Sequence, residues 1–209
     1  MIAINDWWYL ILKQVAETDW LQWLAVVLGV AEVLLAKANS IWLYPAGIGA
    51  TVLSVYILFV AGLYADSLLN GYYIVMSIYG WWYWIKKKNL PPVKISACNR
   101  KDWISVAGII AGSFVMLALL LKNYTPSSVP LWDAWVSATA WAGMWLLAKR
   151  KVENWILLNV SNAFAIPLLF YKRIPLFAAL TIFLFVIGVQ GFIKWRETIN
   201  AERTALIKI

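Results

Sequence analysis

Three side chains suited to holding a flat polar ligand lie on one face of a predicted helix. Trp155, Asn159 and Asn162 are spaced at i, i+4 and i+7, which places them on one side of a helix. Each Asn amide offers two donors and two acceptors, and the indole adds an aromatic surface. Polar groups within an apolar span face a cavity or a neighbouring helix. The pattern favours a site for a heterocycle or a sugar, with helix-to-helix hydrogen bonding as the alternative role.

A second polar face lies on the predicted helix over 67–85. Asn70, Tyr73 and Ser77 follow one another at steps of three or four residues, so they share one side of that helix. Gln190 lies within the predicted helix over 175–193. We expect each of these four side chains either to contact the substrate or to bond a neighbouring helix.

Glu32 is the one ionisable residue well inside a predicted span. It lies about one turn before Lys37, so its carboxylate could reach towards the membrane surface. The functional alternative is a proton or cation site. Because no second buried acid or His accompanies it, we favour the structural interpretation.

Residue types that carry enzymatic chemistry are scarce. The chain has no His and a single Cys, Cys98, which argues against a zinc or haem site and rules out an internal disulfide. It contains neither a phosphate-binding Gly-Lys-Ser/Thr loop nor a Gly-x-Ser-x-Gly elbow. We therefore expect no enzyme activity, no metal and no cofactor.

The composition indicates an integral membrane protein that is all α-helical. Hydrophobic residues make up 63% of the 209-residue chain and charged residues only 13%, with 15 Trp. Soluble domains are about 45–50% apolar and about 25% charged. Residues 1–19 are rich in Trp and Tyr and predict a short helix at the membrane interface. Seven predicted transmembrane helices follow, at 20–36, 41–63, 67–85, 103–121, 131–148, 155–171 and 175–193.

The basic residues predict the orientation. Fourteen of the eighteen Lys and Arg fall on the side that holds the 86–102 loop and the C-terminus. The positive-inside rule then places the C-terminus in the cytoplasm and the N-terminus outside a multi-pass inner, or plasma, membrane. The orientation of the helices in the membrane explains the excess of Lys and Arg. No segment outside the predicted helices is long enough to build a nucleic-acid-binding face.

An internal repeat organises the chain. The pattern WLQW–LLAK of 20–37 recurs as WDAW–LLAK in 132–149, at an offset of 112. Trp42 corresponds to Trp155 at an offset of 113, and GWWYW of 80–84 corresponds to GFIKW of 191–195 at 111. Since the offset covers four helices, the two sets of three helices should point the same way through the membrane.

This arrangement is a 3+1+3 parallel repeat, which is typical of carriers with a substrate site between two bundles. Gly108 and Gly112 in the linker helix permit close packing within the chain or between chains, as in a homo-oligomer. The expected parts are an interfacial segment 1–19, a first bundle 20–85, a loop and linker helix 86–130, a second bundle 131–195 and a cytoplasmic tail 196–209.

The sequence resembles the PnuC family of vitamin transporters. The resemblance covers roughly residues 20 to 196 and is carried by RKVENW at 150–155, FYK at 170–172, LYADS at 63–67 and IYGWWYW at 78–84. It implies a SWEET-like 3+1+3 fold that moves nicotinamide riboside by facilitated diffusion, with a cytoplasmic kinase trapping the product. It also implies substrate contacts from Trp155, Asn159 and Asn162. Leu158 stands where the family often has a second Trp.

Two other functions stay open. Relatives in the family carry thiamine or riboflavin, and thiamine is the closest alternative substrate. A seven-helix receptor would share the predicted orientation, but it has no need of two matched sets of helices. The expected partners are a small vitamin-like molecule and the lipid bilayer.

Overall fold

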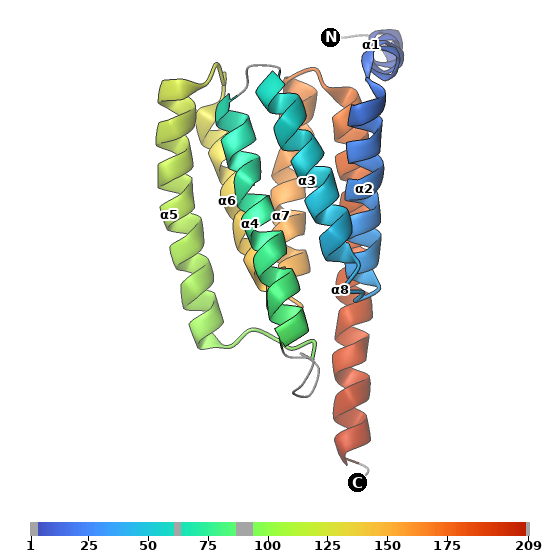
Figure 1. The fold of residues 1–209 in the computed structure, drawn as a ribbon, viewed down its shortest axis with the longest axis vertical. Coiled ribbons are helices and arrows are strands. Elements are labelled where there is room, and N and C mark those ends of the chain that lie inside the picture. Colours follow the sequence, from blue (N-terminus) through green and yellow to red (C-terminus); the bar gives the residue numbers. More distant parts are fainter. Residues whose placement is uncertain (1–3, 61–63, 87–93, 208–209) are drawn as a thin grey trace.

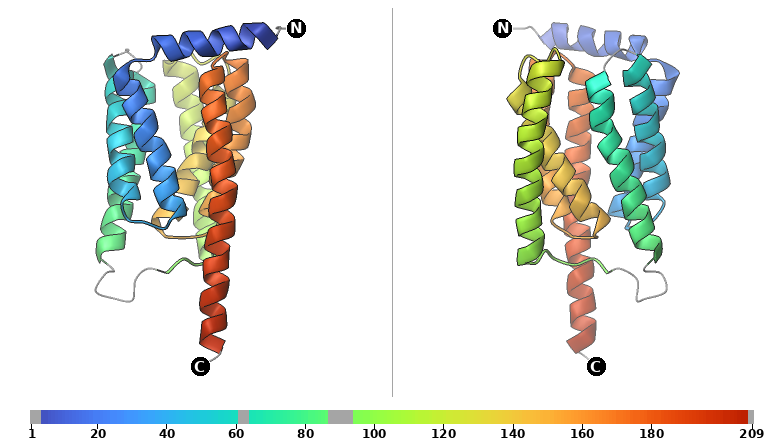
Figure 2. Two further views of the ribbon diagram at one scale, coloured as in Figure 1. Left: turned by 90° about the vertical axis from the view of Figure 1, so that its right-hand side faces the viewer. Right: turned by 60° about the vertical axis from the view of Figure 1, so that its left-hand side comes forward.

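The computed structural model describes residues 4–60, 64–86 and 94–207. The end of the predicted span 41–63, part of the long 86–102 loop and both chain ends thus lie partly outside the described residues. Helices α2 to α8 stand side by side as a bundle, and α1 lies across one end of it (Figures 1 and 2). The helices are α1 (Ile4–Glu17), α2 (Trp20–Lys37), α3 (Leu43–Val60), α4 (Tyr64–Lys86), α5 (Arg100–Tyr124), α6 (Pro130–Ala148), α7 (Asn154–Tyr171) and α8 (Pro175–Ile207).

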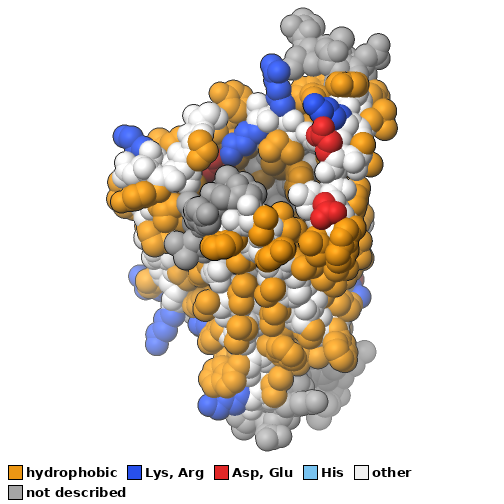
Figure 3. Space-filling model, turned by 45° about the horizontal axis from the view of Figure 1, so that its top comes forward, with side chains coloured by type: hydrophobic (Ala, Val, Ile, Leu, Met, Phe, Trp, Pro, Cys, Tyr) orange, Lys and Arg blue, Asp and Glu red, His pale blue; other side chains and the backbone are white. Residues whose placement is uncertain are grey.

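Five of these helices are long and apolar enough to cross a membrane, namely α2, α3, α5, α7 and α8. Helices α4 and α6, for which the sequence also predicts spans, run beside them in the same bundle (Figure 1). Their lower hydropathy follows from their Trp, Tyr and small polar residues. Apolar side chains cover the flank of the bundle in Figure 3, with charged side chains gathered mainly towards its ends. This distribution suits a bilayer around the bundle.

Side-chain caps begin two of the membrane helices. Asp19 accepts the N–H of Trp20 at 2.8 Å, and Gln22 accepts the N–H of Asp19 at 3.3 Å. The pair Asn99 and Asp102 forms the same reciprocal capping box at the start of α5, at 2.9 and 3.0 Å. Each box satisfies backbone N–H groups that the first helical turn leaves without partners.

Helices α2 and α6 end in the same way. Asn39 follows α2 with φ 55°, and Arg150 follows α6 with φ 53°, so both residues occupy the left-handed region that ends many helices. In both turns the next N–H donates to the carbonyl five residues earlier at 2.9 Å. Asn39 and Arg150 are 111 positions apart, close to the offset of the sequence repeat.

The helices form two consecutive sets of neighbours. Helix α3 packs on α2 and α4, and α7 packs on α6 and α8. The two sets meet where α4 contacts α6 and where α2 contacts α8, while α5 packs mainly on α6. Each set therefore presents its first and third helices to the other set.

Two buried indoles join the sets by matching hydrogen bonds. Trp84 Nε1 on α4 donates to the carbonyl of Ala148 at 3.0 Å. Trp195 Nε1 on α8 donates to the carbonyl of Ala36 at 3.1 Å. In each case a tryptophan of a third helix satisfies a carbonyl in the last turn of the other set's first helix. The Ala148 carbonyl has no other partner among the described residues, whereas the Ala36 carbonyl also accepts the N–H of Asn39 at 2.9 Å.

The same tryptophans make matching aromatic contacts. Tyr44 meets Trp84 edge to face at 5.1 Å, and Trp155 meets Trp195 edge to face at 5.7 Å. Tyr44, and not Trp42, is therefore the counterpart of Trp155. Trp42 is 68% exposed while Trp155 is 2% exposed, so the correspondence of these two tryptophans expected from the sequence is wrong.

The segment before α5 is hydrogen-bonded to the turn between α6 and α7. The N–H of Ser96 donates to the Arg150 carbonyl at 3.1 Å, and the Ser96 carbonyl accepts the N–H of Val152 at 3.0 Å. Glu153 accepts the N–H of Cys98 at 2.8 Å. Burial and the nearby Glu153 carboxylate raise the pKa of the Cys98 thiol to about 12, so the thiol stays protonated at neutral pH.

Candidate functional site

A cavity of about 160 Å³ lies among α2, α6, α7 and α8. It sits at the contact between the two sets of helices, because α2 belongs to one and α6 to α8 belong to the other. Most of its wall is apolar, with a few polar side chains that converge on it. Its polar and aromatic lining consists of Glu32, Trp155, Asn159, Ser161 and Asn162.

Trp155 forms one wall of this cavity. The indole lies against Gly191 of α8, where an added Cβ would be 2.7 Å from Cε2 and Cζ2 of the ring. Its Nε1 is buried and has no hydrogen-bond partner among the described residues. Buried indole N–H groups are normally paired, so this donor is an exception in the wall of the cavity.

Asn159 lines the cavity but is already bonded. With the amide oriented so that both polar atoms are satisfied, Asn159 donates to the Phe185 carbonyl at 3.2 Å and accepts the N–H of Val189 at 3.1 Å. Its side chain lies against Gly188, where no Cβ would fit. Here the helix-to-helix role matches the contacts, and Asn159 fixes α7 against α8.

Asn162 also lines the cavity, and its amide makes no hydrogen bond within the described part of the chain. The neighbouring Ser161 donates to the Val136 carbonyl at 2.7 Å, so it is already paired. Among the three positions that the sequence brings together on one face, Asn162 offers the free donors and acceptors.

The Glu32 carboxylate faces the same cavity, which differs from the structural role favoured from the sequence. Its side chain lies against Gly47 of α3, where an added Cβ would overlap the carboxyl group. Lys37 does not pair with it, because Lys37 Nζ donates to Gln190 at 2.6 Å. The sequence drew attention to Glu32 by its depth in the span, but the facing Gly47 is visible only in three dimensions.

The other predicted site residues lie elsewhere. Gln190 is occupied by Lys37 near the surface. Tyr73 packs with Trp141 and the apolar residues of α5 and α6, and Ser77 is buried on α4. Asn70, Tyr73 and Ser77 do not line the cavity among α2, α6, α7 and α8. The structure thus brings the α7 residues together and separates them from the α4 face.

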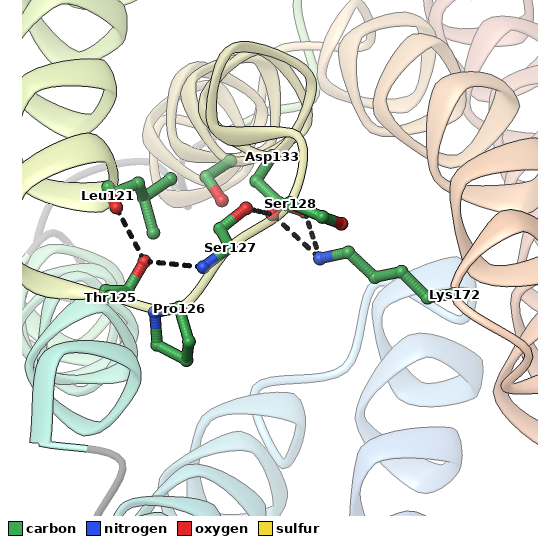
Figure 4. A pocket seen from close by; sticks show the side chains of 8 residues that line it. Leu121, Thr125, Pro126, Ser127, Ser128, Asp133 and Lys172 are labelled. Atoms are coloured by element: carbon green, nitrogen blue, oxygen red, sulfur yellow. Dashed lines mark hydrogen bonds and ion pairs between the residues drawn. The ribbon is translucent and has the colours of Figure 1, made fainter.

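A second, larger pocket of about 430 Å³ opens at the end of the bundle that carries α1. Lys172 pairs with Asp133 at 2.6 and 2.7 Å, and Ser127 donates to the same carboxylate at 2.6 Å (Figure 4). Thr125 and Ser128 add further hydroxyl groups to its wall. We call this the outer pocket. It is rich in hydroxyl groups and paired charge, and no pattern in the sequence indicates it.

The described residues hold no cluster of His, Cys, Asp and Glu that could bind a metal ion. The chemistry that this arrangement can perform is recognition of a solute. The cavity supplies a carboxyl group and an amide without partners among the described residues, beside the aromatic surface of Trp155.

Comparison with known proteins identifies the family. Residues 19–197 match the family described as nicotinamide mononucleotide transporter. The chain belongs to this family. The resemblance to the PnuC family seen in the sequence is thereby confirmed. The chain is 22% identical to the nicotinamide riboside transporter PnuC of Escherichia coli (strain K12), over 90% of this chain and 88% of that protein, and equally so to PnuC of Shigella flexneri.

One solved structure has the same fold as this chain. The crystal structure of the vitamin B3 transporter PnuC aligns with a TM-score of 0.70 at 20% sequence identity, covering 93% of this chain and 88% of the other. The all-helical membrane fold predicted from composition is therefore the one that the family uses.

Proposed function

We propose that this protein is a transporter that takes up nicotinamide riboside by facilitated diffusion. The observation that carries the proposal is the cavity between the two sets of helices, with Trp155 and Asn162 on its wall. An indole and a free amide suit a nucleoside with an amide-bearing ring. The names of the matched relatives in Escherichia coli and Shigella flexneri support the same substrate.

The proposed architecture is seven transmembrane helices in a 3+1+3 arrangement, with α5 as the linker. Matching features support it. Trp84 and Trp195 make equivalent bonds between the sets, and α2 and α6 end in equivalent turns. Two like bundles that meet at a central cavity can alternate its access between the two sides of the membrane.

Within the cavity we propose that Trp155 and Asn162 contact the substrate, and that Asn159 holds the α8 wall in place. Leu158 also lines the cavity, at the position where relatives often carry a second Trp. Thiamine is the second candidate substrate. The wall residues would then select between vitamins by shape and charge.

The proposed orientation places the C-terminus in the cytoplasm and the outer pocket outside the cell. The fourteen basic residues on the C-terminal side support it. A cytoplasmic kinase would then trap the vitamin by phosphorylation. Reporter fusions at Ile209 test the orientation, and activity of a reporter that requires export would contradict it.

Uptake into proteoliposomes tests the function itself. We expect labelled nicotinamide riboside to equilibrate across the membrane, and unlabelled substrate inside to accelerate its entrance by exchange. Protein-free liposomes and parallel assays with thiamine and riboflavin are the controls. Binding without flux would instead favour a receptor, and faster flux of thiamine would make thiamine the substrate.

A further inference from the structure

The Glu32 carboxyl group has no polar partner at the cavity between the two sets of helices. No hydrogen bond or ion pair reaches it from the part of the chain that the structure describes. Among the cations on its side of the bundle, Lys37 binds Gln190 at 2.6 Å, and the Arg150 guanidinium lies 3.5 Å from the centre of the Trp84 ring. An uncompensated carboxylate at membrane depth is costly.

The repeat shows that Glu32 occupies a position where the other set of helices uses apolar packing. The turns that end α2 and α6 superpose Asn39 on Arg150, an offset of 111 that differs by one from the match of the WLQW and WDAW patterns. At this offset Glu32 corresponds to Gly143 and Gly47 corresponds to Leu158. In the first set, the Glu32 side chain of α2 lies against Gly47 of α3. In the second set, the Leu158 side chain of α7 lies against Gly143 of α6. The same contact is filled once by a carboxylate and once by a leucine.

Glu32 and Leu158 both line the cavity, together with Trp155 and Asn162. A leucine at the first contact would fill its space with no desolvation cost, so packing does not require a carboxylate there. The carboxyl group faces a cavity large enough for part of a ligand. A cationic ligand would supply the missing partner and stabilise the ionised carboxylate.

We propose that the Glu32 carboxylate is the counter-ion for a positively charged aromatic ring, so that the cavity selects cationic heteroaromatic vitamins. The inference rests on the proposed transport function and specifies the chemistry of its substrate. The ring of nicotinamide riboside is a pyridinium and that of thiamine a thiazolium, so both fit. Riboflavin, which has no positively charged ring, does not. Trp155 adds an aromatic surface that also favours cations.

The test compares two ligands that differ in ring charge. Nicotinamide riboside and its neutral 1,4-dihydro form are titrated into detergent-purified wild-type protein, Glu32→Gln and Glu17→Gln. Glu17 lies on α1, where it pairs with Lys13 at the surface, and serves as the matched control. We expect wild type and Glu17→Gln to bind the cation at least about tenfold more tightly than the neutral form, as for a charge-assisted contact.

In Glu32→Gln, affinity for the cation should fall by roughly ten- to hundredfold, while affinity for the neutral form changes less than about threefold. Equal weakening of both ligands, or no weakening of either, would overturn the proposal. If Glu32→Gln fails to fold, the wild-type comparison decides, because equal binding of cation and neutral form contradicts a counter-ion.

Thiamine separates this inference from the proposed substrate. Binding of thiamine but not of nicotinamide riboside, lost in Glu32→Gln, would support the counter-ion and refute the proposed vitamin. Binding of neither cation by the wild-type protein would refute both.

Discussion

Adding one methyl group at Gly191 should damage the substrate site, whereas the same change at Gly80 should not. A Cβ at Gly191 would lie 2.7 Å from Cε2 and Cζ2 of Trp155, and a Cβ at Gly80 would lie 2.5 Å from Cε1 of Tyr44. Contacts this short force the ring to move. The two glycines are counterparts in the repeat, but only Trp155 lines the cavity.

The two substitutions should have similar effects on stability. Overpacking a buried contact costs typically about 1–3 kcal/mol, and replacing a helical Gly by Ala recovers at most about 1 kcal/mol. The rings of Trp155 and Tyr44 are buried and held by Trp195 and Trp84, so neither can move aside freely. Both variants should therefore be destabilised by up to about 2 kcal/mol.

Their effects on binding should differ. A displaced Trp155 loses an aromatic contact with the substrate worth about 0.5–1.5 kcal/mol, so Gly191→Ala should weaken binding roughly two- to tenfold. Gly80→Ala should stay within about twofold of wild type. Gly71→Ala is the control on α4, because a Cβ there meets no atom within 4 Å.

Thermal unfolding followed by tryptophan fluorescence measures the change in stability. Titration of folded, monodisperse protein with nicotinamide riboside measures the change in affinity. Unchanged affinity in a destabilised Gly191→Ala protein would refute the placement of Trp155 at the site. Equal loss of affinity in both variants would show that the two glycines act only through general stability.

Three further changes test other parts of the structure. Asn162→Leu should weaken substrate binding by about 1–3 kcal/mol, or roughly 5- to 150-fold. The control Asn200→Leu, on the exposed end of α8, should leave the affinity unchanged. Equal affinities of the two variants would exclude Asn162 from the site. Trp195→Phe removes one of two donors to the Ala36 carbonyl, which keeps the N–H of Asn39, and should lower stability by about 0.5–1.5 kcal/mol; an unchanged unfolding midpoint would contradict this bond. Iodoacetamide should alkylate Cys98 at pH 8 about a thousandfold more slowly than free cysteine, because a pKa near 12 leaves little thiolate. The rate should keep rising above pH 9, and a plateau there would contradict the raised pKa.

The helical membrane fold could be predicted from the sequence because it depends on long apolar runs and on turn residues. Composition alone indicated α-helical membrane spans, and the repeat located the counterparts Gly80 and Gly191 at their offset of 111. The repeat was less reliable where only residue type was matched. Trp42 and Trp155 look alike in the sequence, but one faces outward and the other is buried.

The candidate site was predicted only in part. Residue spacing shows which side chains share one face of a helix, but it does not show which groups of other helices they contact. The spacing of Trp155, Asn159 and Asn162 was informative because all three lie on α7 and line one cavity. It could not show that the Asn159 amide is hydrogen-bonded to the backbone of α8. It also could not pair Glu32 with Gly47, because that contact joins two helices.

The unpaired carboxylate of Glu32 has an electrical consequence for the cell. If a cationic vitamin crosses alone while Glu32 stays with the protein, each turnover moves one net positive charge. A membrane potential of about 100 mV, negative inside, contributes about 2.3 kcal/mol per charge, which is roughly fiftyfold in equilibrium concentration. Such a carrier is electrogenic, so the cell voltage alone concentrates the vitamin before any kinase acts on it.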